Sequence, residues 1–169
     1  STYALLTVFS SQEAQNSFDK SSWYKNYASK SNKHVSAALI PIKGHGTWDG
    51  KSFNTADYKF EKEDIVGVIT RAAIKPHLAA YFWLFVGNIS KMTKNQPELL
   101  FSKGIGTIPI FELATFTLWK NEKSIEKFAY REKPHSKVVK KSRKLKWFRE
   151  ELFIRFVFKG DLKEWKNFL

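Results

Sequence analysis

Apolar and polar positions along the chain repeat with two different periods, and these periods predict the order of strands and helices. Apolar or β-branched runs typical of strands occur at residues 2–9, 35–42, 65–74, 99–102, 110–119 and 148–158. Helical spacing occurs at residues 13–29, from Pro76 to about residue 94, and from Glu122 to about residue 144. Residues 43–64 are polar and contain several glycines, which predicts a linker, and residues 160–169 form a short amphipathic tail.

The helix predicted after Pro76 is apolar around most of its circumference. Residues of one face follow one another at spacings of three and four: Leu78, Phe82, Phe85, Ile89 and Met92. The other side is apolar as well and carries Tyr81, Trp83, Leu84 and Val86. A helix of this kind must be covered on both sides. The second cover would be a partner subunit, a bound apolar molecule or a membrane surface.

Two parts of the chain resemble each other at an offset of 110 residues. The matching pairs are Ala4 and Ala114, Thr7 and Thr117, Phe9 and Trp119, and Phe18 and Phe128. Both copies have the order strand, helix, strand, and a further strand-helix-strand unit at residues 65–102 precedes the second copy. We therefore expect an α+β fold of ferredoxin-like repeats whose antiparallel sheets join into an α+β barrel. The single domain would comprise a partial half at 1–42, the linker at 43–64, a complete half at 65–159 and the tail at 160–169.

Composition and charge narrow the chemistry. The chain has no Cys, which excludes disulfides, thiolate nucleophiles and Cys-ligated metals. Its net charge of +13 is typical of proteins that bind nucleic acid, an anionic membrane surface or an acidic partner. Residues 131–149 hold nine Lys or Arg and one acid, which could form a phosphate-binding patch. An apolar stripe between these charges favours instead the solvated outer face of an amphipathic helix. Aromatic residues do not alternate with the basic ones as base-stacking platforms do, which argues against nucleic acid.

The helix predicted at residues 122–144 carries one histidine on its apolar side. Its apolar face comprises residues three, four or seven apart: Ile125, Phe128, His135, Val138, Val139 and Ser142. Pro134 indicates that the helix breaks near Glu132 and restarts, with His135 in the first turn of the second part. The positive end of the helix dipole disfavours an imidazolium there. A neutral imidazole facing a cavity is the form that a metal or haem iron requires. The alternative is a core histidine bonded to a backbone carbonyl.

Four sequence blocks resemble one known family. They are GTWDGKSF at 46–53, TRAAIKP at 70–76, LLFSKGIGTIPIFELATFTLW at 99–119 and PHSKVVKKSRKLKWFREELFIRF at 134–156. Together they look like the spheroidene monooxygenase family of carotenoid biosynthesis. That family is similar to the haem-binding dimeric α+β barrel proteins, which include chlorite dismutases, haem-degrading monooxygenases and aldoxime dehydratases. It has a further strand-helix-strand before the point where this chain begins, in agreement with a partial first half.

The resemblance implies a haem b cofactor and insertion of oxygen into an apolar small molecule, for example a carotenoid. In several proteins of the broader group a histidine on the helix of a ferredoxin-like half binds the haem iron, and His135 occupies the corresponding helix. Arg71, the lone charge in a strand of buried type, and Arg131, one turn before His135, would bind the haem propionates. An exposed position near the strand end is the alternative for Arg71.

Three aromatic residues are candidates for the substrate pocket: Phe101, Phe116 and Trp119. Each also fits an ordinary core position. The remaining histidines, His34, His45 and His77, are weaker candidates, and no two of them are spaced as a metal pair on one element, which argues against zinc. His45 lies in a Gly-His-Gly sequence that predicts a mobile turn.

Two other functions stay open at this point. The first is a haem enzyme that dehydrates an aldoxime-like substrate or turns over peroxide, although the sequence offers no clear distal histidine. The second is a basic α+β module, without enzymatic activity, that binds nucleic acid or an anionic surface through residues 131–149. Both the haem monooxygenase and the alternative haem enzyme are compatible with a homo-oligomer and with peripheral contact with a membrane. The sequence does not identify the electron donor of such a monooxygenase.

Overall fold

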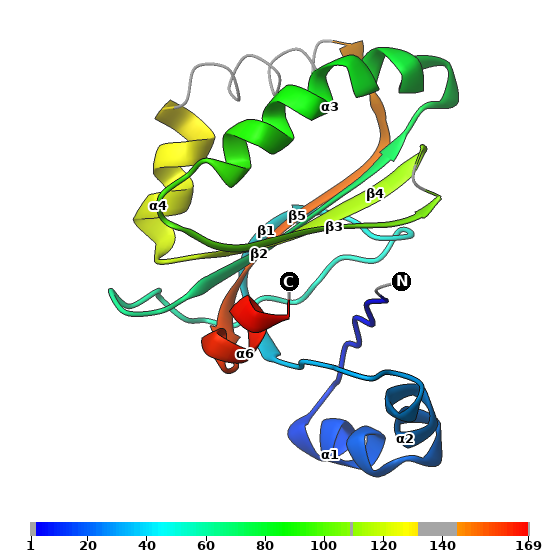
Figure 1. Ribbon diagram of the computed structural model, residues 1–169, viewed down its shortest axis with the longest axis vertical. Helices are drawn as coiled ribbons and strands as arrows, with labels where there is room; N and C mark the ends of the chain where they lie inside the picture. The colour runs from blue at the N-terminus through cyan, green and yellow to red at the C-terminus, as the bar shows by residue number, and fades with distance from the viewer. Residues whose placement is uncertain (1–2, 109, 132–144, 169) are drawn as a thin grey trace. The chain divides into compact units, whose positions relative to one another are not determined.

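The computed structural model describes residues 3–108, 110–131 and 145–168 (Figure 1). The chain divides into two compact units. One unit comprises Ser1–Ser36 and Leu162–Leu169, and the other comprises Ala37–Asp161.

The smaller unit is helical and contains α1 (Gln12–Lys20), α2 (Ser22–Ser29) and α6 (Leu162–Asn167). The single helix predicted at 13–29 is divided at Ser21, whose backbone is extended and whose hydroxyl accepts a hydrogen bond from the amide of Tyr24 at 3.1 Å. Serine is a strong N-cap, so a second helix starts here. The strand predicted at residues 2–9 is wrong, because residues 3–9 have no regular secondary structure. Phe9 instead packs its ring on Phe18, with 5.4 Å between the centroids.

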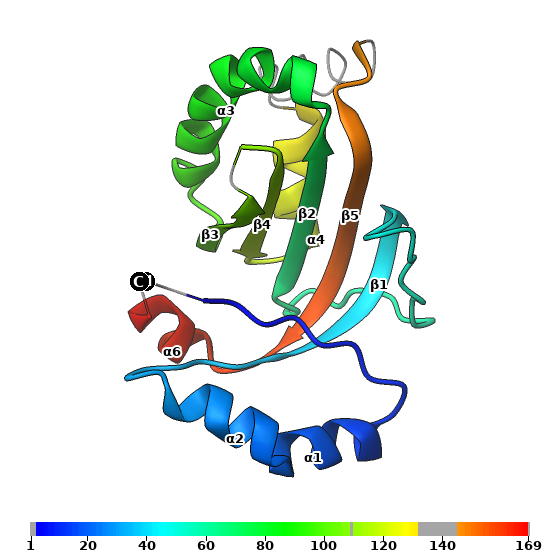
Figure 2. The same ribbon diagram turned by 90° about the vertical axis from the view of Figure 1, so that its right-hand side faces the viewer.

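The larger unit is built on a five-stranded antiparallel sheet, whose strands can be followed in Figure 2. The strands are β1 (Ala38–Gly46), β2 (Val66–Ile74), β3 (Leu99–Ile108), β4 (Glu112–Trp119) and β5 (Phe148–Lys159). Their order across the sheet is β1-β5-β2-β4-β3. Strands β2 to β5 with the two intervening helices have the β-α-β-β-α-β plan of a ferredoxin-like fold, which confirms the predicted order of elements. Strand β1 extends the sheet beside β5.

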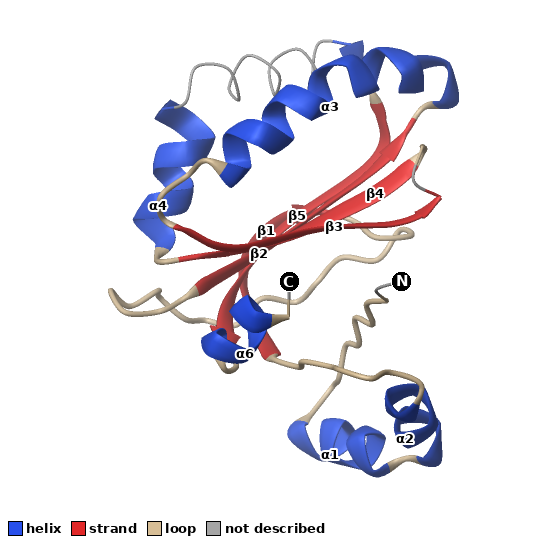
Figure 3. Cartoon of the chain, viewed as in Figure 1, coloured by secondary structure: helices blue, strands red, loops and turns tan. Residues whose placement is uncertain are grey.

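Two helical segments lie over the same face of this sheet (Figure 3). A short turn η1 (Pro76–Leu78) leads into α3 (Ala79–Lys94), since proline fits the first turn of a helix. Helix α4 (Glu122–Glu126) is capped by Asn121, whose side chain accepts from the amide of Ser124 at 3.1 Å, and it continues as the π-helical turn η2 (Lys127–Arg131).

Apolar contacts join these helices to the sheet at two separate places. The α4 cluster comprises Val66, Val68, Trp119, Ile125 and Phe128. The α3 cluster comprises Ile74, Ala79, Phe82 and Trp147. The helix-facing side of the sheet therefore has an apolar cluster towards each end.

Strand β1 differs from its prediction, since it begins at Ala38 and continues to Gly46, into the region predicted as a linker. Two glycines allow this approach to β5. A Cβ at Gly44 would lie 2.8 Å from the carbonyl oxygen of Phe153. Gly46 has φ +88°, and a Cβ there would lie 2.0 Å from the carbonyl oxygen of Glu151. The glycines that suggested a turn therefore make an edge strand possible.

Candidate functional site

The predicted cofactor ligands do not form one described site. His135 lies outside the described residues, and Arg131 ends η2. Arg71 lies in β2 at an odd number of residues from Val66 and Val68, which contact α4. Side chains alternate between the faces of a strand, so Arg71 points to the face opposite the helices.

The three predicted pocket aromatics are divided between the two faces of the sheet. Trp119 belongs to the α4 cluster, and its indole N–H donates to the Thr117 hydroxyl at 2.9 Å. Phe116 is three residues from Trp119 in the same strand and lies on the opposite face, 6.1 Å from the ring of Phe101. All three side chains are buried. They therefore do not line a single pocket.

Arg71 is the centre of an ionic network that we call the Arg71 network. The side chain is only 5% exposed, and its guanidinium contacts the carboxylates of Glu150 at 2.5 Å, Asp49 at 3.0 Å and Glu112 at 3.6 Å. The guanidinium also lies 5.0 Å from the centre of the Trp48 ring. Glu112 is shared with Arg149, whose side chain is exposed. A buried guanidinium is thus compensated by three acids.

Glu150 connects the Arg71 network to the turn that follows β1. Its carboxylate accepts hydrogen bonds from the Gly50 amide at 2.8 Å, the Thr47 hydroxyl at 2.6 Å and the Asp49 amide at 3.1 Å. These bonds, the Gly50 amide foremost, together with the Arg71 guanidinium, lower the pKa of Glu150 to about 2. Glu150 is therefore a carboxylate at neutral pH and holds the turn in place.

The Arg71 network does not fit the predicted contact with a haem propionate. Three carboxylates already neutralise the Arg71 guanidinium, and a further carboxylate would add to an excess of negative charge. The network also lies on the sheet face opposite α4, the helix that leads towards His135. Its observed role is to join strands and a turn.

The helix-facing side has an exposed strip between the α3 and α4 clusters, which we call the central row. Register pairs place its five residues beside one another across the sheet: His45, Phe153, Thr70, Thr115 and Gly104. His45, Thr70 and Gly104 are exposed, whereas Phe153 and Thr115 are half-buried. A Cβ added at Gly104 would have no atom within 4 Å. The central row therefore offers a partly apolar, accessible floor.

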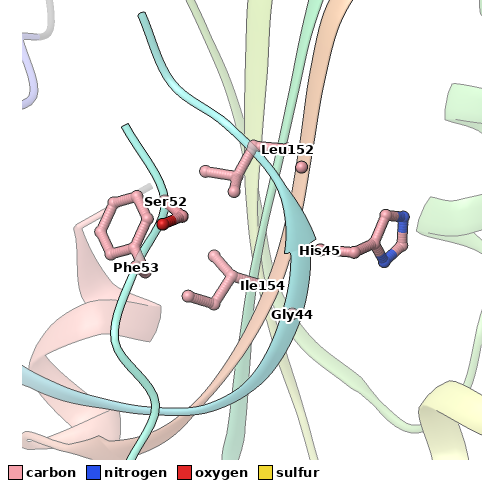
Figure 4. A pocket seen from close by; sticks show the side chains of 7 residues that line it. Gly44, His45, Ser52, Phe53, Leu152 and Ile154 are labelled. Carbon is pink, nitrogen blue, oxygen red and sulfur yellow. The ribbon is translucent and has the colours of Figure 1, made fainter. Parts of the chain in front are cut away.

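His45 lies in a strand and not in the turn that the sequence predicts. It lies within β1, and its ring stacks on Phe153 with 5.6 Å between the centroids. Figure 4 shows its side chain directed away from Phe53, Leu152 and Ile154, which lie on the other side of the strand. Alternation along ALIPIKGHG was a possible signal, but the two glycines favoured a turn. His45 is an exposed imidazole on the helix-facing side.

Two cations lie in the row next to His45 on the same face. Arg155 and Lys43 are register partners in β5 and β1. Arg155 is buried, and its Nη1 lies 3.0 Å from the carboxylate of Glu122 and 3.9 Å from that of Glu126. Its Nε has no hydrogen-bond partner among the described residues. Lys43 is exposed. Because Arg155 is already paired with two carboxylates, Lys43 is the cation that an anionic group over the central row would meet.

A small cavity lies on the other side of β1 (Figure 4). It measures about 190 Å³ and is lined by Gly44, His45, Gly46, Ser52, Phe53, Leu152 and Ile154. Sites for drug-sized ligands measure roughly 300–1,000 Å³. This cavity is too small for a porphyrin or a long polyene, so it is not the predicted substrate pocket.

Sequence comparison confirms the resemblance to spheroidene monooxygenases. The chain is 37% identical over 129 residues to the spheroidene monooxygenase of Rhodobacter capsulatus, which covers 75% of this chain and 54% of that protein. It is 28% identical over 167 residues to the spheroidene monooxygenase of Cereibacter sphaeroides, which covers 98% of this chain and 52% of that protein. The chain therefore spans about half the length of the curated relatives it matches. No family model matches the chain.

Structure comparison supports the fold. The chain resembles a crystal structure of a candidate monooxygenase from Fusobacterium nucleatum with a TM-score of 0.50 and 12% identity. The match covers 88% of this chain and 67% of that chain. At this identity the likeness shows a shared α+β fold alone.

Proposed function

We propose that this chain is part of a haem-dependent monooxygenase of the spheroidene monooxygenase type, which inserts oxygen into an apolar substrate such as a carotenoid. The observation that carries this proposal is the 37% identity over 129 residues to the Rhodobacter capsulatus enzyme. The physical support is the central row, an accessible surface on the helix-facing side that has an imidazole, with the exposed cation Lys43 in the next row.

The proposed haem site lies over the central row. His135, on the segment that follows η2, would bind the iron, and Lys43 would face a propionate in place of Arg71. Phe153 and Thr115 would contact the porphyrin plane. When bound, haem b would supply the oxygen activation. The chain itself would hold the cofactor, exclude water through the α3 and α4 clusters, and present the His45 imidazole as a proton acceptor on the sheet side.

A haem titration tests this proposal. Purified protein mixed with haem should develop a Soret band with saturable, one-to-one stoichiometry, and His135→Ala should abolish or shift that band. His34→Ala is the matched control, because His34 is exposed and belongs to the smaller unit. An identical spectrum for wild type and His135→Ala would remove the ligand assignment. No Soret band in the wild-type protein would remove the haem proposal.

The position of His45 also supports a second candidate, a haem enzyme that turns over peroxide or dehydrates an aldoxime. The sequence argued against it for lack of a distal histidine, and His45 supplies an imidazole on the helix-facing side. Three assays separate the candidates: ferrous protein with oxygen and an apolar polyene, ferric protein with peroxide, and ferrous protein with an aldoxime. Turnover in only the second or third assay would favour this candidate over the monooxygenase.

The finer fold assignment is also a proposal. The sheet face opposite α3 and α4 carries apolar side chains, among them Ile69, Phe116 and Leu118. In an α+β barrel this face would meet the sheet of a second ferredoxin-like half, from the same protein or from a second copy. An experimental structure in which helices cover this face would contradict the barrel.

A further inference from the structure

We propose that the outer surface of α3 docks on an anionic membrane surface. The residues concerned, which we call the α3 patch, are Tyr81, Trp83, Leu84, Ile110 and Leu145. All five are exposed, with Leu84 at 73% and Ile110 at 57%. None of them belongs to the central row, so this inference does not depend on the proposed haem site.

The helical positions place three of these residues together on the outside. Successive residues are turned by about 100° around a helix, so Leu84 lies between Trp83 and Tyr81 on the side opposite Phe82. Phe82 is 7% exposed and anchors α3 in its cluster. The chain thus uses one face of α3 for its core and presents a second apolar face to the surroundings.

Two contacts connect neighbouring segments to this surface. The indole N–H of Trp83 donates to the carbonyl oxygen of Ile110 at 3.0 Å, which places the β3–β4 turn beside α3. The ring of Tyr81 lies 5.8 Å from that of Trp147, which brings the end of the basic segment alongside. The patch therefore combines a helix face with two neighbouring segments.

Charge identifies an anionic partner. Residues 75–96 contain Lys75, Lys91 and Lys94 and no acidic residue. Residues 133–149 contain eight Lys or Arg and no acidic residue. Lys94 and Lys146 are both exposed. Basic residues beside a membrane attract anionic lipid headgroups, and Trp and Tyr favour the interfacial region.

A second copy of the chain fits this surface less well. Two copies joined through the α3 patch would bring together the exposed Lys146 side chains that follow Leu145 of the patch, and like charges repel. The net charge of +13 adds to that repulsion. Helix α3 has 16 residues, and no helix in the described parts of the chain is long and apolar enough to cross a bilayer. The expected contact is therefore one that lies in the interface.

Vesicle flotation tests the proposal with the protein free of haem. We expect the wild type to float with vesicles of phosphatidylcholine and phosphatidylglycerol and not with phosphatidylcholine alone. Binding should fall at about 1 M NaCl, where the Debye length is about 3 Å. Leu84→Glu should lower the partition coefficient about tenfold or more. Val8→Glu is the control, because Val8 is 70% exposed but lies in the smaller unit, and it should bind as wild type does.

Site-specific labelling gives a second measurement that does not depend on a charged substitution. The chain has no Cys, so Leu84→Cys and Val8→Cys each create one labelling position. An environment-sensitive dye at position 84 should shift to the blue on anionic vesicles, and the same dye at position 8 should not. Equal partition of wild type and Leu84→Glu, or equal dye shifts, would overturn the proposal. So would a dimer that Leu84→Glu dissolves, or binding to RNA without binding to vesicles.

Discussion

The guanidinium of Arg71 faces the carboxylate of Glu150 from the neighbouring strand, with 2.5 Å between Nη1 and Oε2. This pair joins β2 to β5, and the remaining contacts of the Arg71 network reach the turn after β1 and the start of β4. Asp49, Arg71, Glu112 and Glu150 each come from a different one of the four sequence blocks that resemble spheroidene monooxygenases. The Arg71 network therefore joins all four of these blocks in the folded chain.

Removal of the Arg71 charge should destabilise the fold. We expect Arg71→Met to lower the free energy of unfolding by about 2 kcal/mol, because three carboxylates would then lie together without their cation. The effect should be smaller than for a fully buried pair, because Asp49 is 73% exposed. Arg149→Met is the matched control, because Arg149 also contacts Glu112 but is 62% exposed. Urea unfolding measures both variants, and equal losses would contradict the structural role of Arg71.

Glu150 should make stability depend on acid pH. Its pKa in the folded chain is lowered from 4.5 to about 2, first by the amide of Gly50 and then by the hydroxyl of Thr47. A depressed folded pKa stabilises the fold above the unfolded pKa and loses this contribution as pH falls from about 4.5 towards 2. Unfolding free energies measured over this range should fall more steeply for wild type than for Glu150→Gln. Parallel profiles would show that Glu150 does not titrate in this way.

Gly46, at the end of β1, and Gly104, in β3, should respond in opposite ways to alanine. Gly46→Ala combines a positive φ with a Cβ 2.0 Å from a backbone carbonyl, so it should cost about 2 kcal/mol or more. Gly104→Ala meets no atom within 4 Å and should be neutral or slightly stabilising. Thermal unfolding of the two variants measures the difference. A stable Gly46→Ala would mean that β1 does not approach β5 as described.

The sequence predicts the central strands well because they are long and apolar on both faces. The strands predicted at 110–119 and 148–158 agree within two residues with β4 and β5. The strand predicted at 2–9 is wrong because an alternating apolar pattern shows only that a segment could join a sheet. The pattern does not specify a neighbouring strand for it to pair with. The sequence predicts one helix across Ser21 because a serine can lie within a helix or cap its start. Only the extended backbone angles of Ser21 show that it caps a second helix.

The site was predicted less well than the fold because its contacts are distant in sequence. Arg71 was singled out as a lone charge, but its partners Asp49, Glu112 and Glu150 lie 22, 41 and 79 residues away. No local pattern contains such pairings. His45 was assigned to a turn because glycine marks turns and also close strand contacts. The register of β1 with β5, which places His45 on Phe153, follows only from the assembled sheet.

The His45 imidazole should affect chemistry without holding the cofactor. We expect His45→Ala to keep the Soret band of the haem-loaded protein and to slow its reaction with hydrogen peroxide about 100-fold, because no base would then accept the peroxide proton. His77→Ala is the control, because His77 is exposed and lies in η1, ahead of α3. Stopped-flow absorbance measures both rates. Loss of the Soret band in His45→Ala, with retention in His135→Ala, would exchange the two assigned roles.

Gly104 provides a direct test of where the haem lies. A bulky side chain at this position would project over the central row, so Gly104→Phe should weaken haem binding at least about tenfold by occupying the floor of the proposed site. It should change the free energy of unfolding by less than about 0.5 kcal/mol, because the space around a new Cβ is open. Ile105→Phe is the matched control, since the next residue of β3 points to the opposite face. Titrations followed at the Soret band measure the two affinities. If Ile105→Phe weakens binding and Gly104→Phe does not, the cofactor lies on the other side of the sheet, and the central row loses its proposed role.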